Sequence, residues 1–381
     1  MAKQDSVDVI QRDTARAFPE FDSGAATITG RIRRVNLHLD RAAEELLRTF
    51  NITGASLDVL AALFAVGPPY QLTPTNLYRG HMMSSAGITA RLDVLERAGL
   101  AARSRDSRDR RGVLVTLTKP GLKLVKEAAH ALHRRQAFVM DVYSDRERKQ
   151  VLSLLKRMLN SLERTGSQTT LPAYEAATAP WVREFPTTDP WLVEFLLVVA
   201  LLTSHINRET ERLLHDHQLS QTAFFILAAL RRASDGHRLS PRDLSQAAVL
   251  SSAGMTAQLD QLEARALVQR SPHPNDRRGI HVTLTRGGQK LVDQAVGTYL
   301  AGHERLVSAL SSSERQQLDA LLRKLLIVLE GRNGETTAAL ASSRGSRSAP
   351  DDAGAPGTDR LPSRPPPRRA ARSTARPGSR S

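Results

Sequence analysis

Cysteine is absent from this sequence of 381 residues. Without thiols the protein forms no disulfide, no cysteine-ligated zinc site and no thiol-based redox sensor. Aromatic residues make up only 4% of the chain, but hydrophobic residues together reach 40%, which is enough for an ordinary core. The length suggests two or three folded domains that depend on hydrophobic burial alone.

Long apolar runs are also missing. The longest, from Trp191 to Leu202, is interrupted by Glu194 and is too short to cross a bilayer, so we interpret it as a buried helix. The N-terminal segment MAKQDSVDVIQRDTARAF has no apolar signal core. These features predict a cytoplasmic, nucleoid-associated protein with no membrane partner.

Acidic residues are in the minority, with 39 Asp and Glu against 54 Lys and Arg, which gives a net charge of +15. Such an excess favours polyanionic partners, with nucleic acid ahead of anionic membrane. The sequence has no phosphate-binding glycine loop, no nucleophile elbow and no His-Glu-x-x-His motif. We therefore expect no enzyme activity, no catalytic residues, no metal and no cofactor.

The chain repeats itself over a long period. The segment SSAGITARLDVLERAGL begins at Ser84 and SSAGMTAQLDQLEARAL begins at Ser251, 167 residues later. The same offset aligns DRRGVLVTLTKPG, from Asp109, with DRRGIHVTLTRGG, from Asp276. A period of this length indicates a duplicated domain.

The repeat predicts the domain organisation. A first domain covers residues 8–163 and a second covers residues 175–330, with a polar linker assigned to residues 164–180. After residue 330 the sequence becomes rich in Arg, Pro, Ser and Ala, and we expect residues 331–381 to form a disordered basic tail.

Each unit has the same expected order of elements. In the first unit, helical periodicity covers residues 32–46 and 57–63, and Thr73-Pro74 is a helix start signal. A helix capped by Ser84 ends at Gly99, and strands at residues 100–103 and 113–117 enclose an arginine-rich turn. Helices over residues 122–139 and 146–162 follow. This order is the winged helix-turn-helix plan, a mainly α fold with small β-hairpin wings.

The helix that begins at Ser84 has chemistry suited to DNA. Its apolar face is Ile88, Leu92 and Leu95, so Ser85, Thr89 and Arg91 point outward, where short polar side chains can approach a phosphate or a base edge. Arginines on a projecting turn suit a narrow, negative minor groove. The residues expected at DNA are Ser84, Ser85, Thr89, Arg91, Arg108, Arg110, Arg111, Ser251, Ser252, Thr256, Gln258, Arg277 and Arg278.

The segment LERAGLAARSRDSRDRRGVLVTLTKPG resembles the signature of the MarR family, the multiple-antibiotic-resistance regulators. The resemblance implies homodimer-like assembly on pseudo-palindromic double-stranded DNA, usually for repression. In this chain the two units would form an intramolecular pseudo-dimer, with Arg111 and Arg278 as the minor-groove arginines. The sequence leaves open whether the pseudo-dimer dimerises further.

The Phe-Pro-x-x-Asp segment at Phe18 is similar to part of a urate-responsive subgroup of this family, which implies an anionic ligand held by a tryptophan, an aspartate and two arginines. The match is split between the units, so the effector implied is a small anionic aromatic compound and not urate itself. The first unit has Asp58, Arg91 and Arg103, with Thr14 in place of the tryptophan. The second has Trp181 and Arg270, with Phe225 and Gln258 at the other two positions.

The two predicted DNA readers differ. Arg91, Val94 and Arg97 correspond to Gln258, Gln261 and Ala264, which predicts an asymmetric operator. The competing hypothesis is a winged-helix module for protein interaction or ligand sensing, in which one unit has lost DNA binding.

Overall fold

The structure is a computed structural model. It describes residues 3–81, 85–105, 112–165, 174–186, 188–233, 236–241, 243–244, 252–273 and 276–345. Residues 1–335 form one compact unit in which both halves of the repeat take part, and residues 336–381 are a separate unit.

The elements of the first half follow the expected order, starting with the N-terminal helix. They are α1 (Ser6–Ala17), α2 (Gly24–Leu47), a 3-10 turn (Arg48–Phe50), α3 (Gly54–Ala65), β1 (Gln71–Leu72), α4 (Pro74–His81), α5 (Ser85–Arg97), β2 (Ala101–Arg105), β3 (Val113–Leu117), α6 (Lys119–Gln136), α7 (Phe138–Asp141) and α8 (Asp145–Thr165).

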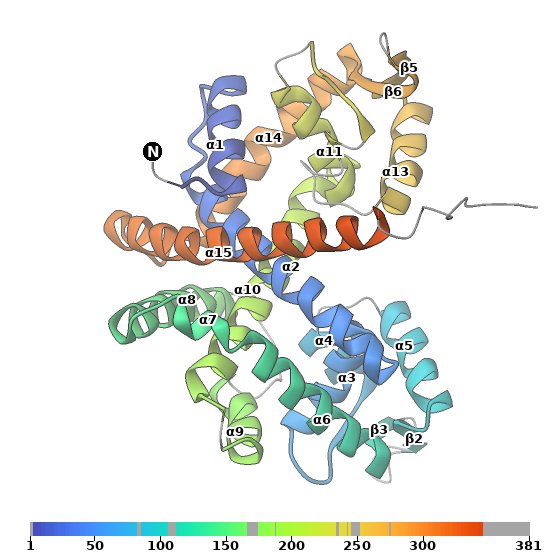
Figure 1. Ribbon diagram of the computed structural model, residues 1–381, viewed down its shortest axis with the longest axis vertical. Helices are drawn as coiled ribbons and strands as arrows, with labels where there is room; N and C mark the ends of the chain where they lie inside the picture. Colours follow the sequence, from blue (N-terminus) through green and yellow to red (C-terminus); the bar gives the residue numbers. More distant parts are fainter. Residues whose placement is uncertain are drawn as a thin grey trace, which may run out of the picture. The chain divides into compact units, whose positions relative to one another are not determined.

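The second half repeats this order (Figure 1). Its elements are α9 (Tyr174–Glu184), α10 (Pro190–His215), α11 (Gln221–Arg232), β4 (Arg238–Leu239), α13 (Ser252–Ala264), β5 (Val268–His273), β6 (Asp276–Leu284), α14 (Arg286–Leu306) and α15 (Ser312–Gly345).

Local capping signals fix the same boundaries in both halves. Thr118 and Thr285 are the N-caps of α6 and α14, and their hydroxyls accept hydrogen bonds from the backbone N–H groups of Gly121 and Gly288. After α5, Gly99 has a φ of +68°, which suits the left-handed residue that ends a helix.

Each half contains a small antiparallel sheet. The strand orders are β1-β3-β2 and β4-β6-β5. Ala101 pairs with Leu117, and Val268 pairs with Leu284 in the same register one repeat later. The expected fold class, mainly helical with small β-hairpins, is confirmed.

Two expected boundaries differ from the structure. Helix α9 begins at Tyr174, so part of the segment predicted as a linker is helical. Helix α15 continues to Gly345, beyond the expected end of folded structure at residue 330. The sequence TTAALASSRG contains good helix formers and no proline, so nothing local ends the helix earlier. Residues 346–381 lie outside the described part.

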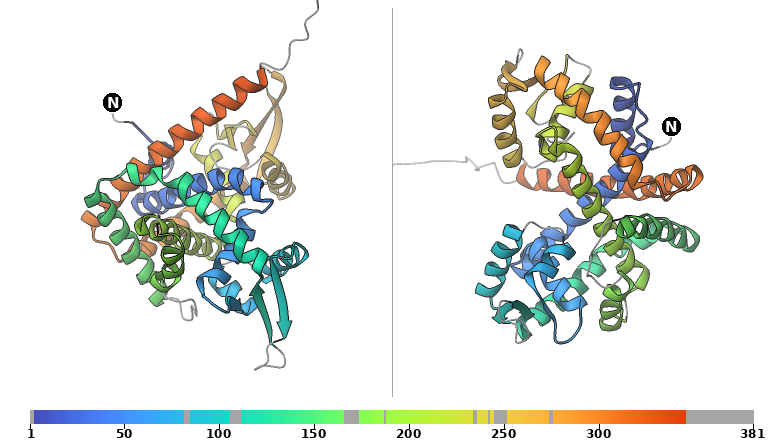
Figure 2. Two further views of the ribbon diagram at one scale, coloured as in Figure 1. Left: turned by 60° about the horizontal axis from the view of Figure 1, so that its bottom comes forward. Right: turned by 180° about the vertical axis from the view of Figure 1, so that it is seen from behind.

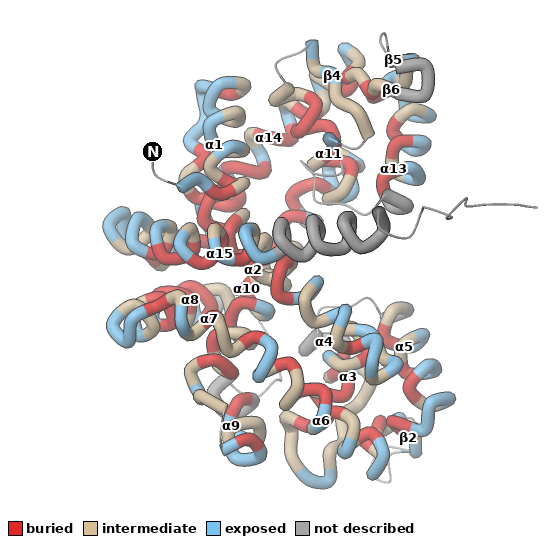
Figure 3. Tube along the Cα trace, viewed as in Figure 1, coloured by how far each residue is buried: buried red, intermediate tan, exposed pale blue. Residues whose placement is uncertain are grey.

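The two halves share one core. Buried residues of α2, α8, α10 and α15 form a single apolar cluster, and these helices converge in Figure 3. Helix α10 contains the apolar run that was expected to be buried, and it packs against α2, α8 and α14. Among the described single helices, α10 alone has the length and composition to cross a membrane. Two smaller cores lie under the hairpins, one in each half.

The contacts between the halves are reciprocal. Gln150 donates to Gln317, which occupies the same position of the repeat, at 2.6 Å. Lys324 pairs with Glu147 at 2.9 Å, and their counterparts Arg157 and Glu314 pair in the same way. A surface that contacts its own copy is the pattern of a two-fold symmetric dimer interface.

The N-terminal helices are exchanged between the halves. Helix α1 packs on α11 of the second half, and Phe18 at its end belongs to the second-half core. In return, α9 packs on α3, and its Trp181 joins the first-half core. Each small core is therefore completed by a helix from the other half.

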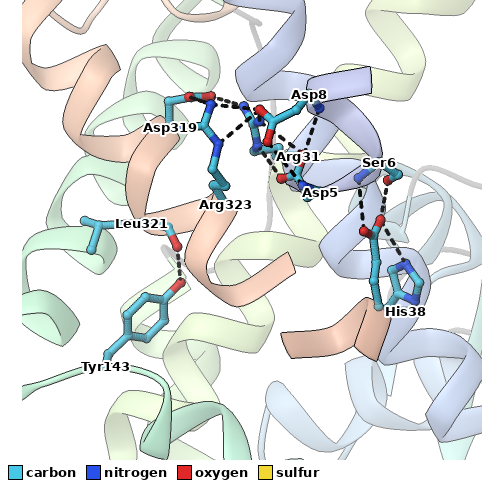
Figure 4. A network of polar contacts seen from close by, with 10 residues as sticks. Asp5, Ser6, Asp8, Arg31, His38, Tyr143, Asp319, Leu321 and Arg323 are labelled. Carbon is cyan, nitrogen blue, oxygen red and sulfur yellow. Dashed lines mark hydrogen bonds and ion pairs between the residues drawn. The ribbon is translucent and has the colours of Figure 1, made fainter. Parts of the chain in front are cut away.

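A buried arginine holds α1 to α2 and α15 (Figure 4). Arg31 is fully buried and forms ion pairs with Asp5, Asp8 and Asp319; the distance from its Nε to Asp5 Oδ2 is 2.8 Å. Ser6 N–H donates to Glu330 of α15 at 3.0 Å. The counterpart of Arg31 is Val198, so this network is specific to the first half.

Arg31→Val introduces the residue of the counterpart position and leaves the fully buried carboxylate of Asp5 without a salt-bridge partner among the described residues, whereas Asp8 and Asp319 keep Arg323. We expect unfolding free energy to fall by about 3–5 kcal/mol, as for other broken buried pairs. Urea unfolding at pH 7 measures the change, with Arg323→Gln, which removes a half-exposed member of the network, as the milder control. Equal stability of the two variants would contradict this role for Arg31.

His303 is fully buried where α14 crosses α2 and α10. Its ring nitrogens contact Thr29 Oγ1 at 2.6 Å and Thr210 Oγ1 at 3.2 Å. Burial, with a smaller effect from nearby Arg33, lowers the pKa of His303 to about 3. His38, His133 and His205 are also neutral because burial lowers the pKa of each to about 4.

The free energy of unfolding should therefore decrease as pH falls below about 6.5, because the histidines of the unfolded chain bind protons there and those of the folded chain do not. Replacing His303 with glutamine, the residue at the counterpart position 136, should reduce the slope by about 1.4 kcal/mol per pH unit between pH 6 and 4. Urea midpoints across this range measure it; an unchanged slope would show that His303 is not neutral in the fold.

Candidate DNA-binding interface

Helices α5 and α13 each bury one face and expose the other. Thr89 and Thr256, at corresponding positions near the N-terminal ends, are both exposed. The buried residues beneath them occupy matching positions: Ile88, Leu92 and Leu95 in α5, and Met255, Leu259 and Leu262 in α13. The two helices lie on the same side of residues 1–335, together with the hairpins (Figure 1, Figure 2).

The described residues include only part of the predicted DNA contacts. Thr89, Arg91, Thr256 and Gln258 are described with their side chains. Four more lie in described helices or strands, but their side chains lie outside the description: Ser85, Ser252, Arg277 and Arg278. Five lie outside the described residues altogether: Ser84, Arg108, Arg110, Arg111 and Ser251.

Arg91 and Gln258 anchor their helices to the preceding one. Arg91 Nη1 donates to Thr53 Oγ1, the N-cap of α3, at 3.1 Å. At the corresponding place, Ser220 Oγ, the N-cap of α11, donates to Gln258 Oε1 at 3.1 Å. Both side chains therefore fix the angle of a recognition helix in addition to any DNA contact.

Arg103 and Arg270 connect each hairpin to its recognition helix. Arg103 Nη1 pairs with Asp93 at 2.5 Å and Glu96 at 2.6 Å, and Nη2 donates to the Thr89 carbonyl at 3.2 Å. The corresponding contacts of Arg270 reach Asp260 at 2.6 Å, Glu263 at 3.4 Å and the Thr256 carbonyl at 3.3 Å. Because the geometry is repeated, it has a positioning role in both halves.

The helix exchange regroups the predicted ligand residues. Trp181 lies in the first-half core, with its ring centroid 4.3 Å from that of Phe64. The half that holds Asp58, Arg91 and Arg103 thus also receives the tryptophan, whereas Arg270 shares its half with Thr14, Phe225 and Gln258. Sequence reasoning placed Trp181 with Arg270 because it assigned each N-terminal helix to its own repeat.

Two neighbouring carboxyl groups, Asp58 beside Arg91 and Asp40 beside Asp58, have raised pKa values. Asp58 is solvent-accessible, but the protein around it displaces water and raises its pKa to about 7, with a further contribution from Asp40. Desolvation and Glu44 raise the pKa of Asp40 to about 6, against the hydrogen bond that it accepts from Asn36 at 2.6 Å.

The structure also contains a cavity that the sequence did not indicate. It lies between α1, α2, α11 and α14, and its lining includes Arg33, Arg34, Arg232 and Tyr299. Two of its lining residues, Thr14 and Phe225, stand at positions that the family resemblance assigned to a ligand. The arginines were marked only by the contrast with their counterpart positions, Ala200, Leu201 and Ala65.

Arg103→Gln should loosen the first hairpin without unfolding the protein. A partly exposed ion pair contributes about 1 kcal/mol, so local opening should become about fivefold more frequent. Faster deuterium exchange at the β2 amides measures this effect. Arg97→Gln is the control, because among the described residues Arg97 Nε donates to the Asp93 carbonyl of its own helix and to no residue of the hairpin. Identical exchange in both variants would show that Arg103 does not hold the hairpin to α5.

Comparison with known proteins agrees with this architecture. A family model described as "MarR family" matches residues 217–279. The regulator PecS of Dickeya dadantii is 28% identical over 158 residues, which are 42% of this chain and 95% of that protein. The multiple antibiotic resistance protein MarR of Escherichia coli is 30% identical over 138 residues, 34% of this chain and 92% of that protein.

A solved structure of a mutant E. coli MarR with operator DNA is 29% identical and covers 32% of this chain and 85% of its own, with a TM-score of 0.30. The match to nearly the whole length of E. coli MarR at 30% identity decides the assignment. This chain is a member of the MarR family of transcriptional regulators.

Proposed function

We propose that this protein is a sequence-specific repressor that binds double-stranded DNA as an intramolecular pseudo-dimer in the cytoplasm. The observation that supports it most is the pair of recognition helices on one side of the molecule, linked by reciprocal contacts between the halves. The net charge of +15 favours a polyanion, and E. coli MarR, a relative, has been solved with operator DNA.

The roles follow from position. Exposed Thr89 and Thr256, with the serines at the N-terminal ends of α5 and α13, reach phosphates or base edges of the major groove. Arg108, Arg110, Arg111, Arg277 and Arg278 of the hairpins supply minor-groove contacts. Repression is relieved by a small anionic aromatic effector.

The two readers favour an asymmetric operator. Val94 is 44% exposed on α5, where α13 has Gln261, and exposed Arg97 corresponds to Ala264. An apolar side chain and an amide select different base edges, so the half-sites should differ.

Arg111→Ala and Arg278→Ala should each weaken DNA binding by about 1–3 kcal/mol, because each removes a charged groove contact. Fluorescence anisotropy with duplex DNA from upstream of the protein's own gene measures the affinity. Arg146→Ala is the control, since Arg146 is exposed and belongs to α8, a helix that Figure 1 shows on the opposite side from α5 and α13.

The outcomes separate the alternatives. Loss in both variants, with binding that weakens steeply as salt rises, supports two engaged wings. Loss in one variant only assigns the other half to ligand sensing or protein contact. If the protein binds no duplex at low salt, the repressor function is rejected. If selection from random duplexes returns a perfect palindrome, the hypothesis of an asymmetric operator is rejected.

A further inference from the structure

Helix α13 exposes a row of residues on the side away from its buried face. The exposed positions recur at helical spacing and are Thr256, Ala257, Asp260, Gln261 and Ala264. The Asp260 carboxylate is already paired with Arg270 of the hairpin, and the two alanines have no polar group. Thr256 and Gln261 therefore supply the polar side-chain groups with which this described row can contact a base edge.

The spacing of these two residues suits the stacking of bases in a duplex. Gln261 lies five residues beyond Thr256, which is about 7.5 Å along the helix axis. Successive base pairs are about 3.4 Å apart. The two side chains can therefore reach base pairs about two steps apart in one half-site.

A chain of hydrogen bonds connects Gln261 to the start of α11. The N-cap Ser220 accepts a hydrogen bond from the Ala223 N–H at 3.1 Å, so the proton of its hydroxyl is available for donation. It donates this proton to Gln258 Oε1 at 3.1 Å. The nitrogen of the same amide then donates to Gln261 Oε1 at 3.2 Å. Each glutamine thus accepts from the side of α11 and turns its nitrogen outward.

The direction of this chain decides what Gln261 offers to DNA. Its oxygen faces Gln258, and its Nε2 has no acceptor among the described residues, so the group left for DNA is a donor with two N–H bonds. A free glutamine offers an acceptor beside a donor, which fits adenine. A side chain that only donates fits guanine, because O6 and N7 of guanine are adjacent acceptors.

The first half lacks this chain. At the corresponding positions of α5, Arg91 Nη1 donates to Thr53 Oγ1 at 3.1 Å, and the outer residue is Val94, which is 44% exposed. Valine presents only methyl groups, and their favourable partner in the major groove is the C5 methyl of thymine. The two halves therefore present different chemistry at one matched position.

We propose that Gln261 reads a guanine in the half-site under α13 by donating hydrogen bonds, and that Val94 reads a thymine at the equivalent position under α5. Ser220 and Gln258 are positioning residues, because they act by orienting the Gln261 amide. This inference rests on the DNA-binding function proposed above and adds the identity of one base in each half-site.

Selection of bound duplexes from a random pool by the full chain tests the wild type. We expect guanine to be preferred over adenine by about tenfold at one position, with thymine at the equivalent position of the other half-site. Gln261→Val identifies the position that belongs to α13, because guanine there should be replaced by thymine. Gln316→Val is the control, since Gln316 is exposed near the start of α15, which Figure 1 shows on the opposite side from α5 and α13.

Two substitutions of Gln258 test the positioning role. In Gln258→Glu the carboxylate can only accept, so Gln261 must donate to it and turn its oxygen outward. The selected base should then change from guanine to cytosine, whose N4 is a donor. In Gln258→Leu the amide of Gln261 is free, and adenine should be selected. A change in the angle of α13 alone would weaken binding without this ordered change of base.

The outcomes separate this inference from the function on which it rests. If wild type binds no duplex at low salt, both are overturned. If wild type binds but guanine is not selected at the position that Gln261→Val identifies, or if Gln258→Glu still selects guanine, only the role of Gln261 is overturned. Fluorescence anisotropy with duplexes that differ in this one base pair measures each preference, and circular dichroism verifies the folding of each variant.

Discussion

The structure depends on the apolar contact between the two halves. Helices α2, α8, α10 and α15 each carry a buried face, and these faces meet in one cluster to which both repeats contribute. Hydrophobic burial is roughly proportional to the area removed from water, so this shared core is the main stabilising interaction. It also sets the relation between α5 and α13, because α2 and α10 lead directly into the parts of the two halves that carry these helices and the hairpins.

Fusion of the halves into one chain permits asymmetry that a homodimer cannot have. In a symmetric dimer every residue occurs at both equivalent positions. Here Arg31 corresponds to Val198 in the other half, and His303 corresponds to Gln136. Arg31 and His303 are both fully buried. A symmetric dimer would have to bury a second copy of each of these polar side chains. Differences in the recognition helices, such as Arg91 and Gln258, then allow unequal readers.

Arginines of the folded part occur in two distinct settings: Arg31 is fully buried, whereas Arg33, Arg34 and Arg232 are partly exposed. Arg31 is surrounded by Asp5, Asp8 and Asp319, which satisfy its charge and hold α1 in place. Arg33, Arg34 and Arg232 face a cavity and meet carboxylates only at longer range in the described structure. The first setting stabilises the fold, because a buried cation needs compensating carboxylates.

The sequence by itself determined the repeat, the order of elements and the exposed faces of the recognition helices. These follow from local physics: Thr118 and Thr285 cap helices, Gly99 ends one, and Ile88, Leu92 and Leu95 recur at the helical period. It also identified which residues of the two halves correspond, but a correspondence does not say which copy packs against which.

Only the tertiary structure decided that α1 and α9 are exchanged, so that Trp181 joins Phe64 and Thr14 lines the cavity with Phe225. These choices arise from packing between segments far apart in the chain, where burial of a face outweighs local preference, and no local pattern encodes them.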